Sequence, residues 1–144
     1  RQEKRLRVDK LVAEVVDDYM LLAKTRGMTF EVNAEPTTIR ANRDMMRHVI
    51  SNLVSNAVRH GDAGSVIKIT CDQHELAIEN ACKPLTKQQL QHVFDPFYRG
   101  SGATTQRTDS SGIGLYTVKM LLDAKGLDYE FVPHGRGMRF VVRF

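Results

Sequence analysis

The stretch His48–Gly61, HVISNLVSNAVRHG, places two asparagines four residues apart inside an apolar helical pattern. On a helix, side chains at i, i+4 and i+7 share one face, so Asn52, Asn56 and Arg59 form a polar stripe. The adjacent face carries only apolar residues: Met46, Val49, Ile50, Leu53 and Ala57. Because unpaired buried amides cost free energy, the stripe indicates a polar ligand such as a metal ion or a phosphate chain. The alternative is that both amides cap neighbouring backbone or face water.

The composition is that of one globular domain: 144 residues, 42% of them hydrophobic, suffice for a core. A net charge of +4 permits nucleic-acid binding, but the basic residues are scattered and no aromatic residues alternate with them as stacking platforms. We therefore expect no nucleic-acid partner and favour an anionic small ligand. Cys71 and Cys82 lack metal-ligand spacing and are interpreted as free thiols in a reducing compartment. The sequence contains no signal peptide and no apolar run that would cross a membrane.

Helical and strand patterns alternate along the chain. Helical spacing predicts helices from Val8 to Leu22 with Gly27 as the stop, from Asn42 or Asp44 to Gly61, and over 112–125 with Gly126 as the stop. Thr86 and Gln89 form a capping box for a short helix through Val93. Alternating residues predict strands over 28–32, 66–72, 76–80, 128–132 and 138–144, with turns at 73–74 and 134–137. This order favours an α+β sandwich, in which one mixed sheet carries helices on one face.

Residues 95–111 form a long polar stretch without a regular pattern, and such connections are usually lids or binding loops. The stretch carries two cations, Arg99 and Arg107, which can neutralise a phosphate chain. Gly112 and Gly114 then open a helix whose free N–H groups favour an anion. We interpret the segment as a nucleotide lid, with an ordinary surface loop as the alternative. Phosphate-binding loops, dinucleotide-binding turns and protein-kinase signatures are absent, so the nucleotide site must be of another kind.

Three segments, NLVSNAVRHG, FDPFYRG and SSGIGLYTVK, occur in this order and resemble the N, F and G2 boxes of one family. That family is the catalytic ATP-binding domain of bacterial two-component sensor histidine kinases, within the superfamily of gyrase, Hsp90, these kinases and MutL. The resemblance runs from about residue 11 to Phe144. It implies a two-layer α/β sandwich with a mixed five-stranded sheet and three main helices on one face.

The resemblance also implies a role for each matching residue. Asn56 matches the asparagine that coordinates Mg²⁺, and Asn52 matches the one that supports the metal and phosphates. Arg59 stands where the family has a phosphate-contacting lysine, and His60 where an aromatic residue packs near the nucleotide. The remaining ATP-site matches lie in the F box, the lid and the G2 turn: Phe97, Arg99, Arg107, Gly112, Gly114 and Leu115; Phe94 also matches the F box, which anchors the start of the lid.

One box departs from the family pattern. The family's G1 box reads D-x-G-x-G, and its aspartate accepts a hydrogen bond from the adenine amino group. Here Asn80 occupies the aspartate position, while Cys82 and Pro84 replace the glycines. An amide oxygen can accept the same bond, but it carries no charge, so we expect ATP binding of reduced affinity.

The implied activity is transfer of the γ-phosphoryl of Mg²⁺-ATP to a histidine on a separate dimerisation domain, for relay to a response regulator. None of the five histidines has the phosphoacceptor context, so we expect no catalytic residue and no self-phosphorylation in this chain. We expect residues 1–144 to form one domain, with residues 1–10 as the trailing end of a dimerisation helix or a linker. The resemblance implies a monomeric cytoplasmic domain from a dimeric membrane sensor.

Three alternatives remain open. Superfamily ATPases use a glutamate where this chain has Asn52, so a motor of the gyrase or Hsp90 type lacks its general base. Anti-sigma-factor serine kinases share the NAV-x-HG ending, but they usually carry that glutamate too and lack the FDPFYRG segment. A degenerate pseudokinase, signalling through contacts alone, would account for the altered G1 box.

Overall fold

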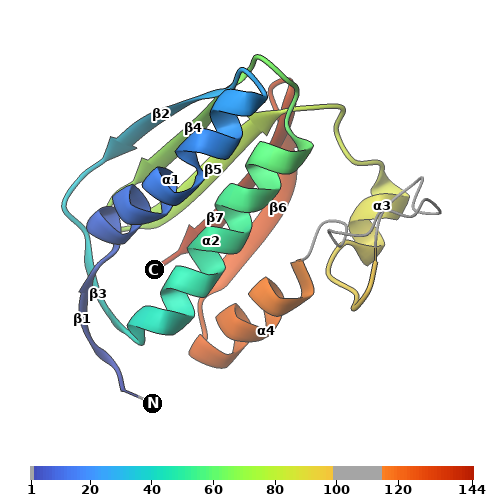
Figure 1. Ribbon diagram of the computed structural model, residues 1–144. Coiled ribbons are helices and arrows are strands. Elements are labelled where there is room, and N and C mark those ends of the chain that lie inside the picture. The colour runs from blue at the N-terminus through green and yellow to red at the C-terminus, as the bar shows by residue number, and fades with distance from the viewer. Residues whose placement is uncertain (1, 99–114) are drawn as a thin grey trace.

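Seven strands and four helices form within residues 2–98 and 115–144, the parts of the chain that the computed structural model describes (Figure 1). In chain order they are β1 (Lys4–Arg7), α1 (Val8–Thr25), β2 (Thr29–Ala34), β3 (Thr38–Ala41), α2 (Arg43–His60), β4 (Val66–Cys71), β5 (Glu75–Ala81), α3 (Lys87–His92), α4 (Leu115–Lys125), β6 (Asp128–His134) and β7 (Gly137–Arg143).

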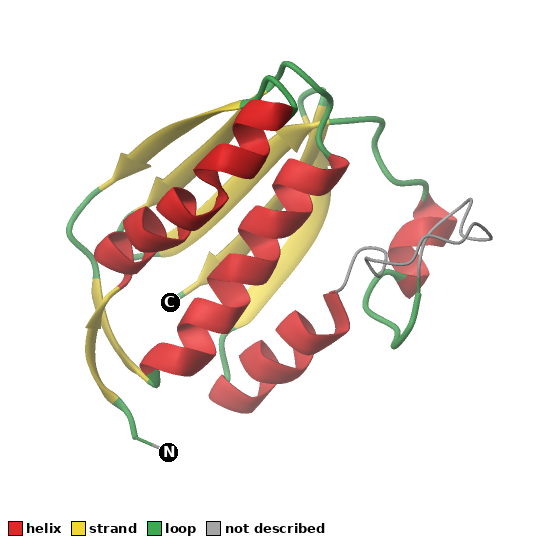
Figure 2. Cartoon of the chain, in the orientation of Figure 1, coloured by secondary structure: helices red, strands yellow, loops and turns green. Residues whose placement is uncertain are grey.

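Five of the strands form one mixed sheet in the order β2-β4-β5-β7-β6. The β2–β4 pair is parallel and the other three pairs are antiparallel. Helices α1, α2 and α4 lie on the same face of this sheet, and Figure 2 shows the resulting two layers. The predicted α+β sandwich with a five-stranded mixed sheet and three main helices is therefore confirmed.

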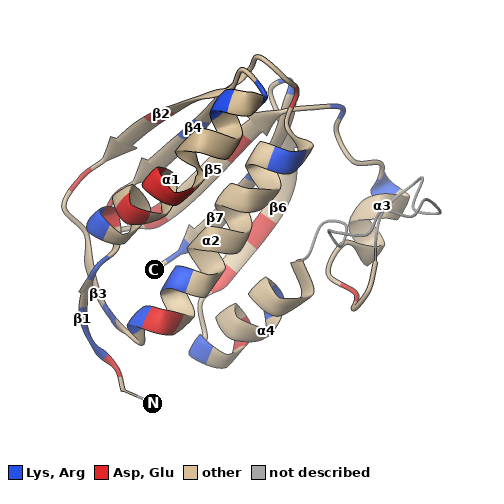
Figure 3. Ribbon diagram, viewed as in Figure 1, with Lys and Arg blue, Asp and Glu red and all other residues tan. Residues whose placement is uncertain are grey.

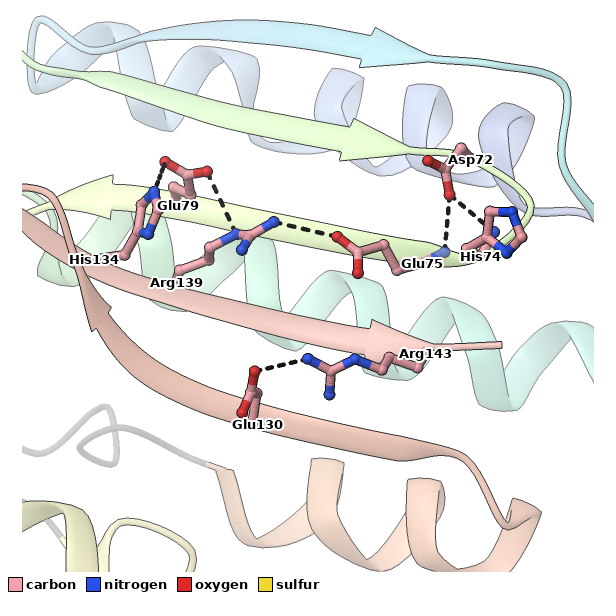
Figure 4. Close-up of polar contacts among 8 residues, drawn as sticks. All are labelled: Asp72, His74, Glu75, Glu79, Glu130, His134, Arg139 and Arg143. Atoms are coloured by element: carbon pink, nitrogen blue, oxygen red, sulfur yellow. Dashed lines mark hydrogen bonds and ion pairs between the residues drawn. The ribbon is translucent and has the colours of Figure 1, made fainter.

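The core lies between the sheet and this helix layer. Alternate residues of the inner strands point toward the helices and are buried: Ile67, Ile69, Leu76, Ile78, Phe140 and Val142. The opposite face of the sheet is charged. There Arg139 Nη2 lies 3.2 Å from Glu75 Oε2, and Arg143 Nη2 lies 2.7 Å from Glu130 Oε2 (Figure 4). Apolar burial on one face and ion pairs on the other fix the register of the strands.

Helix α2 begins and ends where the sequence predicts. The side chain of Asn42 accepts a hydrogen bond from Met45 N at 2.9 Å, which satisfies one of the free N–H groups of the first turn. At the other end, Gly61 N donates to Ala57 O at 2.9 Å. The predicted apolar face is entirely buried: Met46, Val49, Ile50, Leu53 and Ala57. Helix α2 therefore anchors the helix layer on the sheet.

The β4–β5 hairpin and the capping box of α3 are also confirmed. Asp72 accepts hydrogen bonds from His74 N and Glu75 N in the hairpin turn (Figure 4). Thr86 Oγ1 accepts from Gln89 N, while the Gln89 side chain accepts from Thr86 N. In both motifs the hydrogen bonds join residues at most three positions apart, so the motifs can be recognised in the sequence.

The N-terminal segment begins with a short strand. Within residues 1–10, expected to be the trailing end of a dimerisation helix or a linker, Lys4–Arg7 form β1, and α1 begins at Val8. Strand β1 pairs antiparallel with β3, a strand that was not predicted, and Leu6 lies opposite Ile39. Leu6 is buried against the core, which gives this two-stranded ribbon its stability. Figure 3 shows Lys and Arg along the ribbon.

Candidate functional site

A cavity of about 340 Å³ lies between α2, the sheet and the start of α4. Its volume is within the range of small-molecule sites. The lining residues are Leu53, Asn56, Ala57, His60, Asp62, Ile78, Asn80, Cys82, Lys83, Leu85, Leu115, Phe131, Met138 and Phe140. Most of them come from α2, the inner strands and the segment after β5. Helix α2 and the inner strands of the sheet therefore shape most of the cavity.

The walls of the cavity are mainly apolar. Ile78, Met138 and Phe140 project from adjacent inner strands and are at most 4% exposed. Phe131 on the edge strand packs against Phe140 with ring centroids 5.6 Å apart. Leu53 and Ala57 of α2 face them across the cavity. This lining suits a flat, largely apolar group such as an aromatic base.

Asn56 is a polar residue of this lining whose side-chain hydrogen bonding is incomplete. Its Nδ2 atom is buried and has no hydrogen-bond partner among the described residues. An unpaired buried amide nitrogen costs about 1–3 kcal/mol, so its retention beside an apolar wall points to a ligand oxygen. The amide oxygen of the same side chain can also ligate a hard cation such as Mg²⁺. Asn56 therefore fits a phosphate chain with its metal ion.

The C-terminal end of α2 is held in place by Arg26. The guanidinium donates from Nη1 to the carbonyl of Val58 and to that of Gly61, the latter at 2.7 Å. These carbonyls belong to the last turn of the helix and to the capping residue that follows it, where a cation is favourable. The bonds fix the turn that carries His60 into the cavity wall. Arg26 thus positions the site from outside it.

A polar group of residues lines the cavity where β5 ends. Asn80 projects from β5 on the helix side of the sheet, and Asp62 is fixed beside it because its N–H donates to Ala81 O at 2.8 Å. Burial raises the pKa of the Cys82 thiol, the nearby charge of Asp62 raises it further, and a hydrogen bond with the Asn80 side chain lowers it. The thiol is therefore held protonated next to an amide that can donate or accept.

Of the predicted site residues, the structure brings Asn56, His60, Asn80 and Leu115 together in the cavity wall. Asn52 instead lines a neighbouring open groove, one helical turn away, with Asp44, Arg47, His48 and Ser51. Asn52 and Asn56 thus face two adjacent depressions along the same helix.

Two other predicted residues do not line the cavity. Arg59 is exposed, and its Nε donates to Ser55 Oγ at 2.9 Å, because its position turns it toward solvent at the end of α2. Phe97 is 96% exposed, with a φ of 65°, whereas Phe94 packs on Tyr129 with centroids 5.6 Å apart. Four further predicted residues lie outside the described parts of the chain: Arg99, Arg107, Gly112 and Gly114.

Several lining residues were not predicted. Asp62 and Lys83 flank recognised positions without a motif of their own. Phe131, Met138 and Phe140 come from strands more than fifty residues after Asn80, although Met138 lies directly opposite it in the β5–β7 register. Only the pairing of the strands indicates these contacts.

No group of three or more His, Cys, Asp or Glu residues that could hold a metal ion occurs within residues 2–98 and 115–144. A divalent cation at this cavity would therefore rest on amide oxygens and on the ligand's own phosphates, as is common for Mg²⁺.

Residues 41–144 match the family described as histidine kinase-, DNA gyrase B- and HSP90-like ATPases. The chain belongs to this ATPase family. Within it, the chain is 34% identical over 138 residues to the sensor histidine protein kinase HK06 of Streptococcus pneumoniae serotype 2. It is 30% identical over 145 residues to the sensor histidine kinase CusS of Escherichia coli K12.

These alignments cover 95% and 98% of this chain but only 31% and 30% of the two kinases. The chain thus spans about a third of the length of these relatives of the ATPase family.

Solved structures of histidine kinases have the same fold. The catalytic domain of histidine kinase ThkA superposes with a TM-score of 0.87 at 20% identity, covering 100% of this chain and 95% of that one. ThkA in complex with the response regulator TrrA gives a TM-score of 0.77 at 22% identity, covering 99% of this chain and 41% of that one. No helix in the described parts of the chain is long and apolar enough to cross a membrane.

Proposed function

We propose that this chain is the catalytic ATP-binding domain of a two-component sensor histidine kinase. It binds Mg²⁺-ATP and delivers the γ-phosphoryl group to a histidine on a separate dimerisation domain. The observation that carries the proposal is the buried side-chain nitrogen of Asn56, which has no hydrogen-bond partner among the described residues and lies in the wall of an apolar cavity. Membership of the ATPase family and the similarity to two sensor kinases support it.

Binding and orientation are the tasks of the residues in the cavity. The apolar surfaces of Ile78, Met138 and Phe140 take up the base, and the polar group around Asn80 contacts its edge. Asn56 faces the phosphates and, with Asn52, holds the Mg²⁺ ion that neutralises their charge. Since phosphoryl transfer needs mainly positioning and charge neutralisation, these residues can support it without a nucleophile of their own.

The remaining predicted residues belong at the phosphate end. Arg59 is exposed at the end of α2, and its side chain can swing from Ser55 to a phosphate because that hydrogen bond lies at the surface. We assign Arg99 and Arg107 to the lid, Gly112 and Gly114 to the turn beneath the phosphates, and Phe97 to the start of the lid. These assignments rest on the motif positions alone.

The amide at position 52 argues against an ATPase motor of the gyrase or Hsp90 type. A motor needs a carboxylate there to activate water, and an amide cannot take up the proton. Hydrolysis without a base is slow, which suits a domain that must keep its phosphoryl group for a histidine. The same amide separates the chain from anti-sigma-factor serine kinases, and the FDPFYRG segment supports that distinction.

Two protein partners follow from the proposal. The first is the chain's own dimerisation domain, which supplies the phosphoacceptor histidine, with β1 as the connection to it. The second is a cognate response regulator, and the complex of ThkA with TrrA supports such a partner. We place the domain in the cytoplasm, where ATP is available, as part of a homodimeric membrane sensor.

The two cysteines offer a direct test of nucleotide binding. Cys82 lines the cavity, whereas Cys71 is 3% exposed, so an alkylating reagent should modify Cys82 first. We expect Mg²⁺-ATP to protect Cys82 in a saturable manner, and Asn56→Ala to weaken this protection more than tenfold. An absence of protection at millimolar ATP would overturn the proposal.

Phosphoryl transfer requires a second measurement. The full-length kinase incubated with γ-labelled ATP should acquire acid-labile phosphate, as expected for phosphohistidine. Acid-stable phosphate on a serine of a partner would favour the anti-sigma-factor class. ATP binding without any transfer would identify a pseudokinase.

A further inference from the structure

The side-chain amide of Asn80 lies at the base-binding end of the cavity. Its chemistry affects which purine base the cavity accepts. Resting on the proposed function, we propose that Asn80 allows this site to bind guanine nucleotides as well as adenine nucleotides. The two bases differ at C6, where adenine has an amino group that donates and guanine has a keto oxygen that accepts. A side chain that faces this position therefore decides between them.

Asn80 is held where it can contact the edge of a bound base. It lies two residues after Ile78, which is 4% exposed, so both side chains are on the cavity side of β5. Its backbone is packed closely: a Cβ placed at Gly137 would lie 1.9 Å from Asn80 O, and one at Gly61 would lie 3.4 Å from Asn80 Cβ. Since Ile78, Met138 and Phe140 take the ring face, the amide contacts the ring edge.

The amide can satisfy either base. A carboxylate only accepts hydrogen bonds, so it attracts the amino group of adenine and repels the keto oxygen of guanine. Asn80 presents its oxygen in one orientation and its N–H₂ group in the other. Its neighbour, the Cys82 thiol, is both a weak donor and a weak acceptor, so their hydrogen bond can persist in both orientations.

Two charged residues at the same end extend this tolerance. Asp62 lines the cavity beside Asn80, and its carboxylate can accept from N1–H and the 2-amino group, which guanine has and adenine lacks. Lys83 also lines the cavity and can donate to a ring nitrogen of adenine. The group formed by Asp62, Asn80 and Lys83 thus offers donors and acceptors to both bases.

The experiment compares dissociation constants of Mg²⁺-ATP and Mg²⁺-GTP, measured by calorimetry on the full domain and on the Asn80→Asp variant. We expect the two nucleotides to bind the native domain within about tenfold of each other. Asn80→Asp should weaken GTP binding at least tenfold relative to ATP, since a carboxylate would face the keto oxygen. A thermal unfolding scan establishes that the variant is folded.

Two further variants make the outcome specific. Asn33→Asp introduces the same charge change on the exposed edge strand β2, and it should leave the GTP/ATP ratio unchanged. Asp62→Asn should weaken GTP more than ATP, which keeps the test decisive if Asn80→Asp fails to fold. If the native domain bound ATP but bound GTP more than a hundredfold more weakly, this inference would be overturned and the proposed function would stand. Binding of neither nucleotide would overturn both.

Discussion

Asp9 stabilises the junction between β1 and α1 through its charge. Its carboxylate accepts from Arg7 Nε at 2.8 Å and from Thr37 N at 2.9 Å, and its side chain is 13% exposed. The Arg7 guanidinium is the largest cause that holds the pKa of this carboxyl far below its usual range. Because the Arg7 side chain is 41% exposed, solvent screens part of this attraction.

The sign of the pH dependence follows from this lowered pKa. The stabilisation is complete above the unfolded-state pKa of about 4, and it is lost as the pH falls toward the lower folded-state pKa. Asp9→Asn should therefore lower the free energy of unfolding by about 1 kcal/mol at pH 7, with a smaller difference at pH 3. Urea titrations at both pH values measure this. Asp17→Asn, exposed on the same helix, is the control, and an Asp9→Asn deficit independent of pH would contradict the prediction.

At the scale of elements, the ribbon of β1 and β3 contains an unfavourable pair. Arg5 and Arg40 lie directly opposite each other in the antiparallel register, and both are exposed. Like charges in this arrangement are destabilising. Arg40→Glu should raise the free energy of unfolding by about 0.5 kcal/mol at low ionic strength, with a smaller gain in 1 M salt.

A double-mutant cycle assigns this gain to the pair. In an Arg5→Gln background, Arg40→Glu should give no increase, and with Arg5→Glu it should become unfavourable. A gain of equal size in all three backgrounds would mean that the effect comes from net charge and not from the cross-strand contact.

The elements recognised in sequence are those whose ends depend on neighbouring residues. Helix α2 has Asn42 three residues before the N–H that it caps, and α3 has its capping box. Strands β1 and β3 are only four residues long: β1 has a single apolar residue among three basic ones, and the alternation of β3 is too short to identify a strand. They exist because Leu6 and Ile39 pack on the core together, which requires pairing of segments more than thirty residues apart.

At the scale of the whole molecule, the cavity was predictable only in part. Asn56 was identified because an amide interrupts an apolar helical pattern, and that interruption has a physical cost wherever the helix packs. The opposite wall depends on the order of the sheet, which brings β5 beside β7 and β7 beside β6. Phe131 and Met138 therefore line the site although no motif marks them, and Asp62 lies there because its N–H donates to Ala81 O at the end of β5.

Nucleotide binding should stabilise the entire sheet, and Cys71 can report this. Cys71 lies on an inner strand between β2 and β5, is 3% exposed and contacts Thr37 Oγ1 at 3.5 Å through its Sγ atom. Burial raises the pKa of its thiol, so a reagent reaches a reactive thiolate only after the molecule opens. Its rate of modification therefore measures the population of the open state.

If this opening is global unfolding, a ligand that binds only the folded state lowers the rate of modification in proportion to one plus its concentration over Kd. At ATP concentrations of about one hundred times Kd, Cys71 should react about a hundredfold more slowly, although it lies outside the cavity. Mass spectrometry of the separate cysteine peptides follows Cys71 and Cys82 in one sample. The rate for Cys71 should also rise with urea along the slope of equilibrium unfolding. A rate of Cys71 modification that changed with neither ATP nor urea would show that β4 opens locally, and that the sheet is not one cooperative unit.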